Sequence, residues 1–120
     1  MTKILVHLAT GPHDPTRGAL AFLVARTAAA AGHEVTVFVA GDAVAYLRDP
    51  TMDAAHGIGT GSVREHYAAL EAAGVRIYAS GMSSKARAVD AEALGGKAVE
   101  FAPPDRLVEL IVESDRTVTY

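Results

Sequence analysis

The sequence predicts an α/β fold: a single-domain, three-layer sandwich of about five mostly parallel strands with helices on both faces. Short apolar runs rich in β-branched residues alternate with helix-forming runs, in the order β-α-β-α-α-β-α-β-α-β. Such alternation is typical of parallel sheets joined by right-handed crossovers. The chain has 120 residues, 50% of them hydrophobic and 21% charged. It can therefore bury a core, but it is too short for two full domains.

The first strand and helix are indicated by an apolar run followed by helix-capping residues. Residues 3–9 (KILVHLA) read as a strand of the kind that is buried on both faces of a parallel sheet. Asp14 is a good N-cap, Pro15 suits the first helical position, and Gly32 suits the residue that follows the helix. The spacing predicts that the inner face of this helix consists of Leu20, Leu23, Val24, Thr27, Ala28 and Ala31.

The middle of the chain contains a second strand, two predicted helices and a loop. Residues 34–40 form the strand, and residues 43–49 form a short helix. Residues 49–61 carry three glycines and no periodicity, so we expect a long loop of the functional or mobile kind. Residues 62–65 (SVRE) form a capping box for a helix that ends at Gly74. The buried face of that helix is predicted to consist of Val63, Tyr67 and Leu70.

The last third of the chain begins with a strand that gives way abruptly to small, polar and basic residues. This strand spans residues 75–79 (VRIYA), and Ser83 or Ser84 is expected to cap a short helix that carries Lys85 and Arg87. The remaining predicted elements are helical turns over 90–96, a strand over 97–102, a helix from Pro103-Pro104 with Leu107, Leu110 and Ile111 on its inner face, and an edge strand over 116–120.

Charge and composition argue against several classes of function. The formal net charge is −3 and no basic stripe is present, so we expect no nucleic acid partner. No apolar stretch approaches the roughly 20 residues that a membrane span needs, and no signal-peptide pattern is visible. We therefore expect a cytoplasmic protein with no membrane contact. The chain has no cysteine, which excludes disulfides, thiolate metal ligands and a thiol nucleophile.

The residues with chemical potential are expected at one edge of the sheet. In an open parallel sheet, ligands bind beyond the carboxyl ends of the strands. Segments 10–14, 41–43 and 80–87 reach that edge, and loop 49–61 can fold over them. The candidate ligand-binding residues are Gly11, His13, Asp42, His56, Ser80, Gly81, Met82, Ser83, Ser84 and Arg87, with Asp14 beside them.

The glycines and histidines lack the spacings that define common nucleotide and metal sites. The glycine-containing segments match neither the Walker A loop nor the dinucleotide fingerprint, so these glycines are interpreted as turn residues. His7 is interpreted as a hydrogen-bonded core residue and His33 as a solvent-exposed one. No two histidines form a His-x-x-x-His pair, so we predict no metal and no other cofactor. His13 and His56 can still meet at the carboxyl edge beside Asp14 or Asp42, which keeps metal-assisted chemistry open as an alternative.

Ser80 and the basic residues after it each allow two interpretations. Ser80 lacks the leading glycine of the G-x-S-x-G elbow, so a turn serine bonded to local backbone is favoured over a nucleophile. The start of the following helix, together with Lys85 and Arg87, would form a modest site for an anion. An ordinary capped helix with solvated charges explains the same residues equally well.

The order of elements and one stretch of sequence together resemble the DsrE/DsrF-like sulfur-relay family, which includes TusD-type subunits. The stretch GVRIYASGMSSKARAV has the family layout: a Gly74-Val75 turn, a strand, small residues, and then Arg87 and Val89. Ser80 stands where family members have a cysteine. The resemblance covers nearly the whole chain.

The resemblance implies a small cytoplasmic protein that assembles as a homotrimer or homohexamer and works with sulfur-relay partners. Family members with the cysteine carry sulfur as a persulfide, which the oxygen of Ser80 cannot form. We therefore expect a binding or assembly subunit rather than an enzyme, with a pocket at residues 80–87 for a small anion or a sulfur-containing metabolite. The alternative is a small hydrolase or metal-assisted enzyme that uses His13, Asp42, His56 or Ser80.

The predicted edge strand also bears on assembly. Val118 and Tyr120 are apolar enough to need cover. We expect loop 49–61 of a neighbouring copy to supply it.

Overall fold

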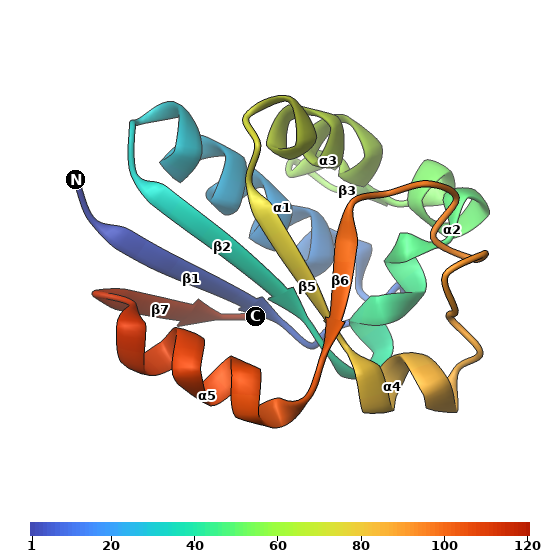
Figure 1. The fold of residues 1–120 in the computed structure, drawn as a ribbon. Helices are drawn as coiled ribbons and strands as arrows, with labels where there is room; N and C mark the ends of the chain where they lie inside the picture. Colours follow the sequence, from blue (N-terminus) through green and yellow to red (C-terminus); the bar gives the residue numbers. More distant parts are fainter.

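The structure, a computed structural model that describes all 120 residues, contains a five-stranded sheet between layers of helices (Figure 1). The strand order is β6-β5-β2-β1-β7, and every neighbouring pair is parallel. The predicted α/β fold is confirmed. The strands of this sheet are β1 (Lys3–Leu8), β2 (Glu34–Val39), β5 (Arg76–Ser80), β6 (Val99–Ala102) and β7 (Arg116–Thr119).

The helices cover the two faces of the sheet unequally. In Figure 1, α1 and α3 lie on one face and α5 lies on the other. A two-stranded hairpin of β3 (His56–Gly57) and β4 (Gly61–Ser62) precedes α3. The helices are α1 (Pro15–Ala30), the 3-10 helix η1 (Gly41–Leu47), α2 (Asp49–Ala54), α3 (Val63–Ala72), α4 (Gly81–Ala86) and α5 (Pro104–Glu113).

The predicted helix caps of α1 and α3 are confirmed. The Asp14 carboxylate accepts a hydrogen bond from the Arg17 amide at 3.1 Å, and Pro15 is the first residue of α1. The Ser62 hydroxyl accepts one from the Glu65 amide at 3.2 Å at the start of α3. Such side-chain acceptors stabilise helix starts because the first amides of a helix have no backbone partner. The predicted buried face of α3 is also confirmed: Val63, Tyr67 and Leu70 are buried.

The predicted inner face of α1 is wrong. Of that predicted set, Thr27 and Ala31 are exposed, and the others are only half-buried. The apolar residues of α1 surround the whole helix, so their spacing could not select one side. Small residues on the true face allow the helix to lie close to the sheet. The buried residues of α1 are Gly18, Ala19, Ala21, Phe22 and Ala25.

The segment 49–61, predicted as a long loop, is instead folded into α2 and the β3-β4 hairpin. It packs against α1 of its own chain. The Thr16 hydroxyl accepts a hydrogen bond from the Ile58 amide at 3.0 Å, and the Thr60 hydroxyl donates one to the Thr16 carbonyl at 3.0 Å. These hydrogen bonds join residues 42 and 44 positions apart, so no local sequence pattern could reveal them. Val118 and Tyr120 are half-buried against the core of the same chain.

Four smaller predictions also need correction. The helix predicted over 43–49 is the 3-10 helix η1, and His7, predicted to be hydrogen-bonded, has a buried Nε2 atom without a hydrogen-bond partner. The turns predicted over 90–96 are present, with the Leu94 amide donating to the Asp90 carbonyl at 3.3 Å. Ile111, predicted to face inward, is 44% exposed, whereas Leu110 is buried. His33 is half-buried, because its Nδ1 accepts from the Thr2 amide at 3.2 Å.

No helix of this chain combines the length and the apolar character that crossing a membrane requires.

Candidate functional site

Three chain segments meet at the carboxyl edge of the sheet, as predicted. Gly11, after β1, lies against Asp42, after β2: a Cβ atom on Gly11 would lie 2.5 Å from the Asp42 Cβ. Only glycine permits so close an approach. The amide of Gly41 donates to the Ser83 hydroxyl at 2.8 Å, which connects the end of β2 to α4. Gly11, Asp42 and Ser83 are therefore brought together.

Ser80 is the last residue of β5, and its side chain begins α4. Its hydroxyl oxygen accepts from the Ser83 amide at 3.1 Å, so Ser80 is the N-cap and the helix starts at Gly81. The prediction of Ser83 or Ser84 as the cap is wrong, because the strand runs directly into the helix with no intervening loop. No histidine hydrogen-bonds to Ser80, and its observed contact is to local backbone.

Arg87 is paired with Asp42 across the same edge. Its Nη2 and Nε donate to Asp42 Oδ1 at 2.9 and 3.2 Å, and its Nη1 donates to the Ser83 carbonyl at 3.2 Å. The two side chains are 37% and 60% exposed, so the ion pair contributes little to stability. The Asp42 carboxylate therefore occupies two of the hydrogen-bond donors of the Arg87 guanidinium.

The other predicted site residues do not converge on this point. Met82 is 71% exposed, and Ser84 is buried with a hydroxyl that has no hydrogen-bond partner. Gly81 is half-buried, with the Ala102 carbonyl 3.6 Å from where its Cβ would be. His13 and His56 are exposed. No group of three or more histidine and acidic side chains is placed to hold a metal ion.

Tyr46 of η1 is a residue of this edge that the sequence interpretation missed. It is buried, and its hydroxyl donates to the Gly11 carbonyl at 3.0 Å. Burial, with a smaller contribution from the charge of Asp14, raises the pKa of Tyr46 to about 12. The phenol therefore stays protonated and holds the loop after β1. Gly18, inside α1, was the available signal: a Cβ there would lie 2.1 Å from the Tyr46 hydroxyl oxygen.

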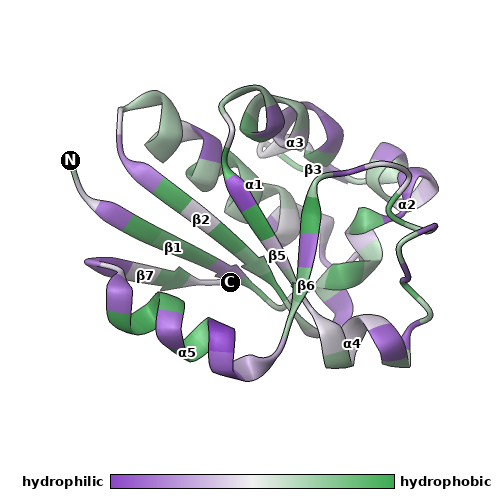
Figure 2. Cartoon of the chain, viewed as in Figure 1, coloured by the Kyte–Doolittle hydropathy of each residue, from purple (hydrophilic) through white to green (hydrophobic).

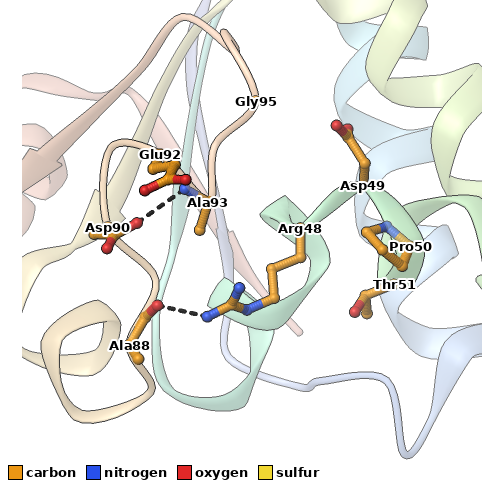
Figure 3. Close-up of a pocket in the computed structure, with 9 residues that line it drawn as sticks. All are labelled: Arg48, Asp49, Pro50, Thr51, Ala88, Asp90, Glu92, Ala93 and Gly95. Carbon is orange, nitrogen blue, oxygen red and sulfur yellow. Dashed lines mark hydrogen bonds between the residues drawn. The ribbon is translucent and has the colours of Figure 1, made fainter.

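The largest cavity, about 480 Å³, lies beyond the end of α4 rather than at Ser80 (Figure 3). Arg48 points into it and donates to the Ala88 carbonyl, while Asp90 accepts from the Ala93 amide at 2.9 Å. The remaining ionisable groups of the lining are the carboxylates of Asp49 and Glu92. With three carboxylates and one guanidinium, this cavity is unsuited to an anion. None of the predicted site residues lines it.

Asp49 connects this cavity to α3 and to the segment before β6. Its carboxylate accepts from Arg64 at 2.8 Å and from the Lys97 ammonium, whose side chain is only 4% exposed. Hydrogen bonds from Arg64 and then Lys97 lower the pKa of Asp49 to about 2. Arg64 also donates to Asp53 at 2.7 Å. The network fixes α2 to α3 and to the segment before β6, and no local sequence signal could have linked residues so far apart.

The comparisons with known proteins bear on the fold and the family. The model of the DsrE/DsrF-like family matches residues 2–120. The chain belongs to this family. The resemblance seen in the sequence is thereby confirmed, and the family implies a fold related to sulfur relay.

A solved structure has a similar fold. The fold is similar to that in the crystal structure of the YchN protein from E. coli, with a TM-score of 0.80 over 100% of both chains. The sequence identity is 17%, so this likeness concerns the fold alone. A search of curated proteins gave no match.

Proposed function

We propose that this DsrE/DsrF-like protein serves in cytoplasmic sulfur relay as a binding and assembly subunit rather than as a sulfur carrier. The observation that carries the proposal is the role of Ser80. In the family resemblance this residue takes the place of the persulfide-forming cysteine, and its hydroxyl oxygen is used to cap α4. The chain has no cysteine, so it cannot form a persulfide on a thiol of its own.

The turn from Ser80 to Arg87 is the proposed contact for a small anion or a sulfur-containing metabolite. The first backbone amides of α4 point toward the end of β5, where that of Ser83 already donates to Ser80, and Arg87 supplies a guanidinium suited to oxyanions. Asp42 holds that guanidinium in the unliganded protein. A bound anion therefore replaces the Asp42 carboxylate at the Arg87 guanidinium. We expect its binding to be weak while Asp42 is charged.

Titration with thiosulfate, sulfate and phosphate, followed by NMR of the backbone amides, tests this contact. We expect the signals of residues 81–85 and of Arg87 to shift, and Asp42→Asn to tighten binding about tenfold by removing the competing charge. Asp53→Asn is the matched control, because it removes an exposed carboxylate that pairs with Arg64 instead. Unshifted signals in both the wild type and Asp42→Asn, together with an empty turn in soaked crystals, would contradict the proposal.

Assembly is the second part of the proposed role, with a homotrimer or homohexamer as the expected state and a sulfur-relay protein as a further partner. Three apolar residues of α5 face solvent: Val108 is 58%, Ile111 is 44% and Val112 is 78% exposed. Figure 2 shows hydrophobic residues alternating with hydrophilic ones along this helix. The strands β6 and β7 also end the sheet with unpaired edges, which invite further contacts. Sedimentation of the purified protein measures the state, and a strict monomer would argue against this part.

A further inference from the structure

A second polar cleft lies at the amino edge of the sheet, at the opposite ends of the strands from Ser80. Its volume is about 300 Å³, at the lower end of the range typical of small-molecule sites, roughly 300–1,000 Å³. It lies between α5 and the first residues of β2 and β5. The charged residues that line it are Glu34, Arg76, Arg106 and Glu113.

Two guanidinium groups in this cleft converge on one phenol oxygen. Arg76, at the start of β5, donates from Nη1 to the Tyr78 hydroxyl at 3.4 Å, and Arg106 of α5 donates from Nη2 at 3.2 Å. The Tyr78 ring is buried and stacked on Phe38, with ring centroids 6.3 Å apart and an interplanar angle of 21°. Arg106 also lies over the Tyr78 ring, with its Cζ 5.3 Å from the centroid. The position of the hydroxyl is therefore set by the core of this face.

The cleft has a surplus of hydrogen-bond donors at this point. The Tyr78 oxygen accepts from both arginines, and its own hydroxyl proton donates to no acceptor in the structure. A phenol has one donor and can accept more than one bond, so three donor groups meet at the Tyr78 oxygen. Two guanidinium groups this close repel each other, and an oxyanion would remove the repulsion.

The carboxylates of the cleft only partly balance these charges. Glu34 pairs with Lys3 at 3.7 Å, and Glu113 reaches Arg106 at only 3.9 Å. The closest ionic partner of Arg106 is Glu109, at 2.9 Å along the same helix. Arg76 forms no ion pair. Arg76 is therefore the guanidinium of the cleft that has no carboxylate partner.

We propose that this cleft binds the phosphate or sulfate group of a small metabolite. Arg76 and Arg106 donate to its oxygens, and the buried Tyr78 hydroxyl beneath them holds the two guanidinium groups together. Guanidinium groups match the oxygen spacing of such anions, which a single ammonium does not. The site shares no residue with the turn from Ser80 to Arg87 and lies at the other edge of the sheet, so it stands apart from the function proposed above.

Titration with inorganic phosphate and with sulfate, followed by NMR of arginine Nε–H groups and backbone amides, tests the cleft. We expect the signals of Arg76, Arg106 and Tyr78 to shift together on one binding curve. Arg76→Ala and Arg106→Ala should each weaken binding about tenfold. Tyr78→Phe, which keeps the stacked ring, should weaken it about threefold. Glu113→Gln should tighten it, because a competing carboxylate is removed.

Two control variants separate this site from general charge effects and from the other edge. Arg116→Ala removes an exposed guanidinium on β7 that lines no part of the cleft, and it should leave binding unchanged. Arg17→Ala, which removes an exposed guanidinium at the start of α1 near the other edge, should also leave it unchanged. If Arg106→Ala fails to fold, the exposed Arg76 still tests the proposal. Equal weakening by Arg116→Ala and Arg76→Ala, or no shift at Arg76 and Arg106 at tens of millimolar phosphate, would overturn it.

Discussion

The two faces of the sheet differ sharply in how much they bury. The face under α1, α3 and η1 carries a cluster of 22 buried residues, and the face under α5 carries one of five. A helix pair with η1 beside it fills the space above one face, whereas a single helix cannot cover the other. Buried apolar area is the main source of folding stability. The α1-α3 face therefore sets the stability, and the α5 face has surface left for contacts and ligands.

The amino-edge cleft and the exposed apolar residues of α5 both follow from this thin coverage. The cleft opens where α5 leaves the first residues of β2 and β5 uncovered. Val112, on the outer side of the same helix, is 78% exposed. On the α1-α3 face, by comparison, the polar groups serve structure: Tyr46 is hydrogen-bonded to the Gly11 carbonyl inside the core.

The largest expected effect is the loss of a core side chain from the α1-α3 face. Phe22→Ala removes a ring that is 1% exposed and packs edge-on against Tyr46. We expect the free energy of unfolding to fall by about 3–5 kcal/mol, which urea or thermal unfolding measures. Phe101→Ala is the matched control, because this ring on the edge strand β6 is 36% exposed. Equal losses in the two variants would remove the contrast between a deep core and a thin sheet edge.

On the α5 face we expect a substitution to have a smaller effect on stability and a measurable effect on assembly. Val112→Asp changes a highly exposed residue, so the free energy of unfolding should shift by no more than about 0.5 kcal/mol. If the outer face of α5 is the contact between copies, the charge should dissociate the assembly in sedimentation experiments. Asp105→Asn serves as the control, because it changes a residue of α5 that is already polar. An unchanged assembly in Val112→Asp would place the contact elsewhere.

The smallest expected effect is a different response of the two faces to pH. Burial lowers the pKa of His7, which lies edge-on to Phe38 on the α5 face. The unfolded chain then binds a proton at His7 more readily than the folded chain does. The free energy of unfolding therefore decreases as the pH falls below about 6.5. The raised pKa of Tyr46, about 12, has the opposite consequence: its contribution is lost as the pH rises from about 10 toward 12.

Thermal unfolding from pH 5 to pH 11 measures both limbs. His7→Gln should flatten the acid limb, and Tyr46→Phe should flatten the alkaline limb while lowering stability throughout, because the bond to the Gly11 carbonyl is lost. Limbs of unchanged slope in both variants would show that other groups control the pH dependence.

The parts of the fold that the sequence predicted correctly are those set by local chemistry. The caps at Asp14 and Ser62 and the amphipathic pattern of α3 depend on residues a few positions apart, and each is confirmed. The inner face of α1 could not be chosen, since apolar residues surround that helix. The alternation of strands and helices was enough to predict the parallel sheet, because right-handed crossovers leave few other arrangements.

The candidate site was predicted less completely, because it depends on contacts between distant segments. The convergence of Gly11, Asp42 and Ser83 follows from the carboxyl-edge rule. The pairing of Arg87 with Asp42 was missed, since the sequence shows two charges and not the distance between them. The same is true of Asp49 with Lys97, and of the two arginines that meet at Tyr78. Each of these contacts joins separate elements of the fold.

The pairing of β7 with β1 has a consequence for how the protein is made. The Lys3 amide donates to the Asp115 carboxylate at 2.8 Å across a separation of 112 residues, and Ile4 pairs with Arg116. On the ribosome, β1 emerges long before the strand that covers its outer edge is synthesised. During translation that edge stays open to other chains until β7 has been made, so the sheet closes late.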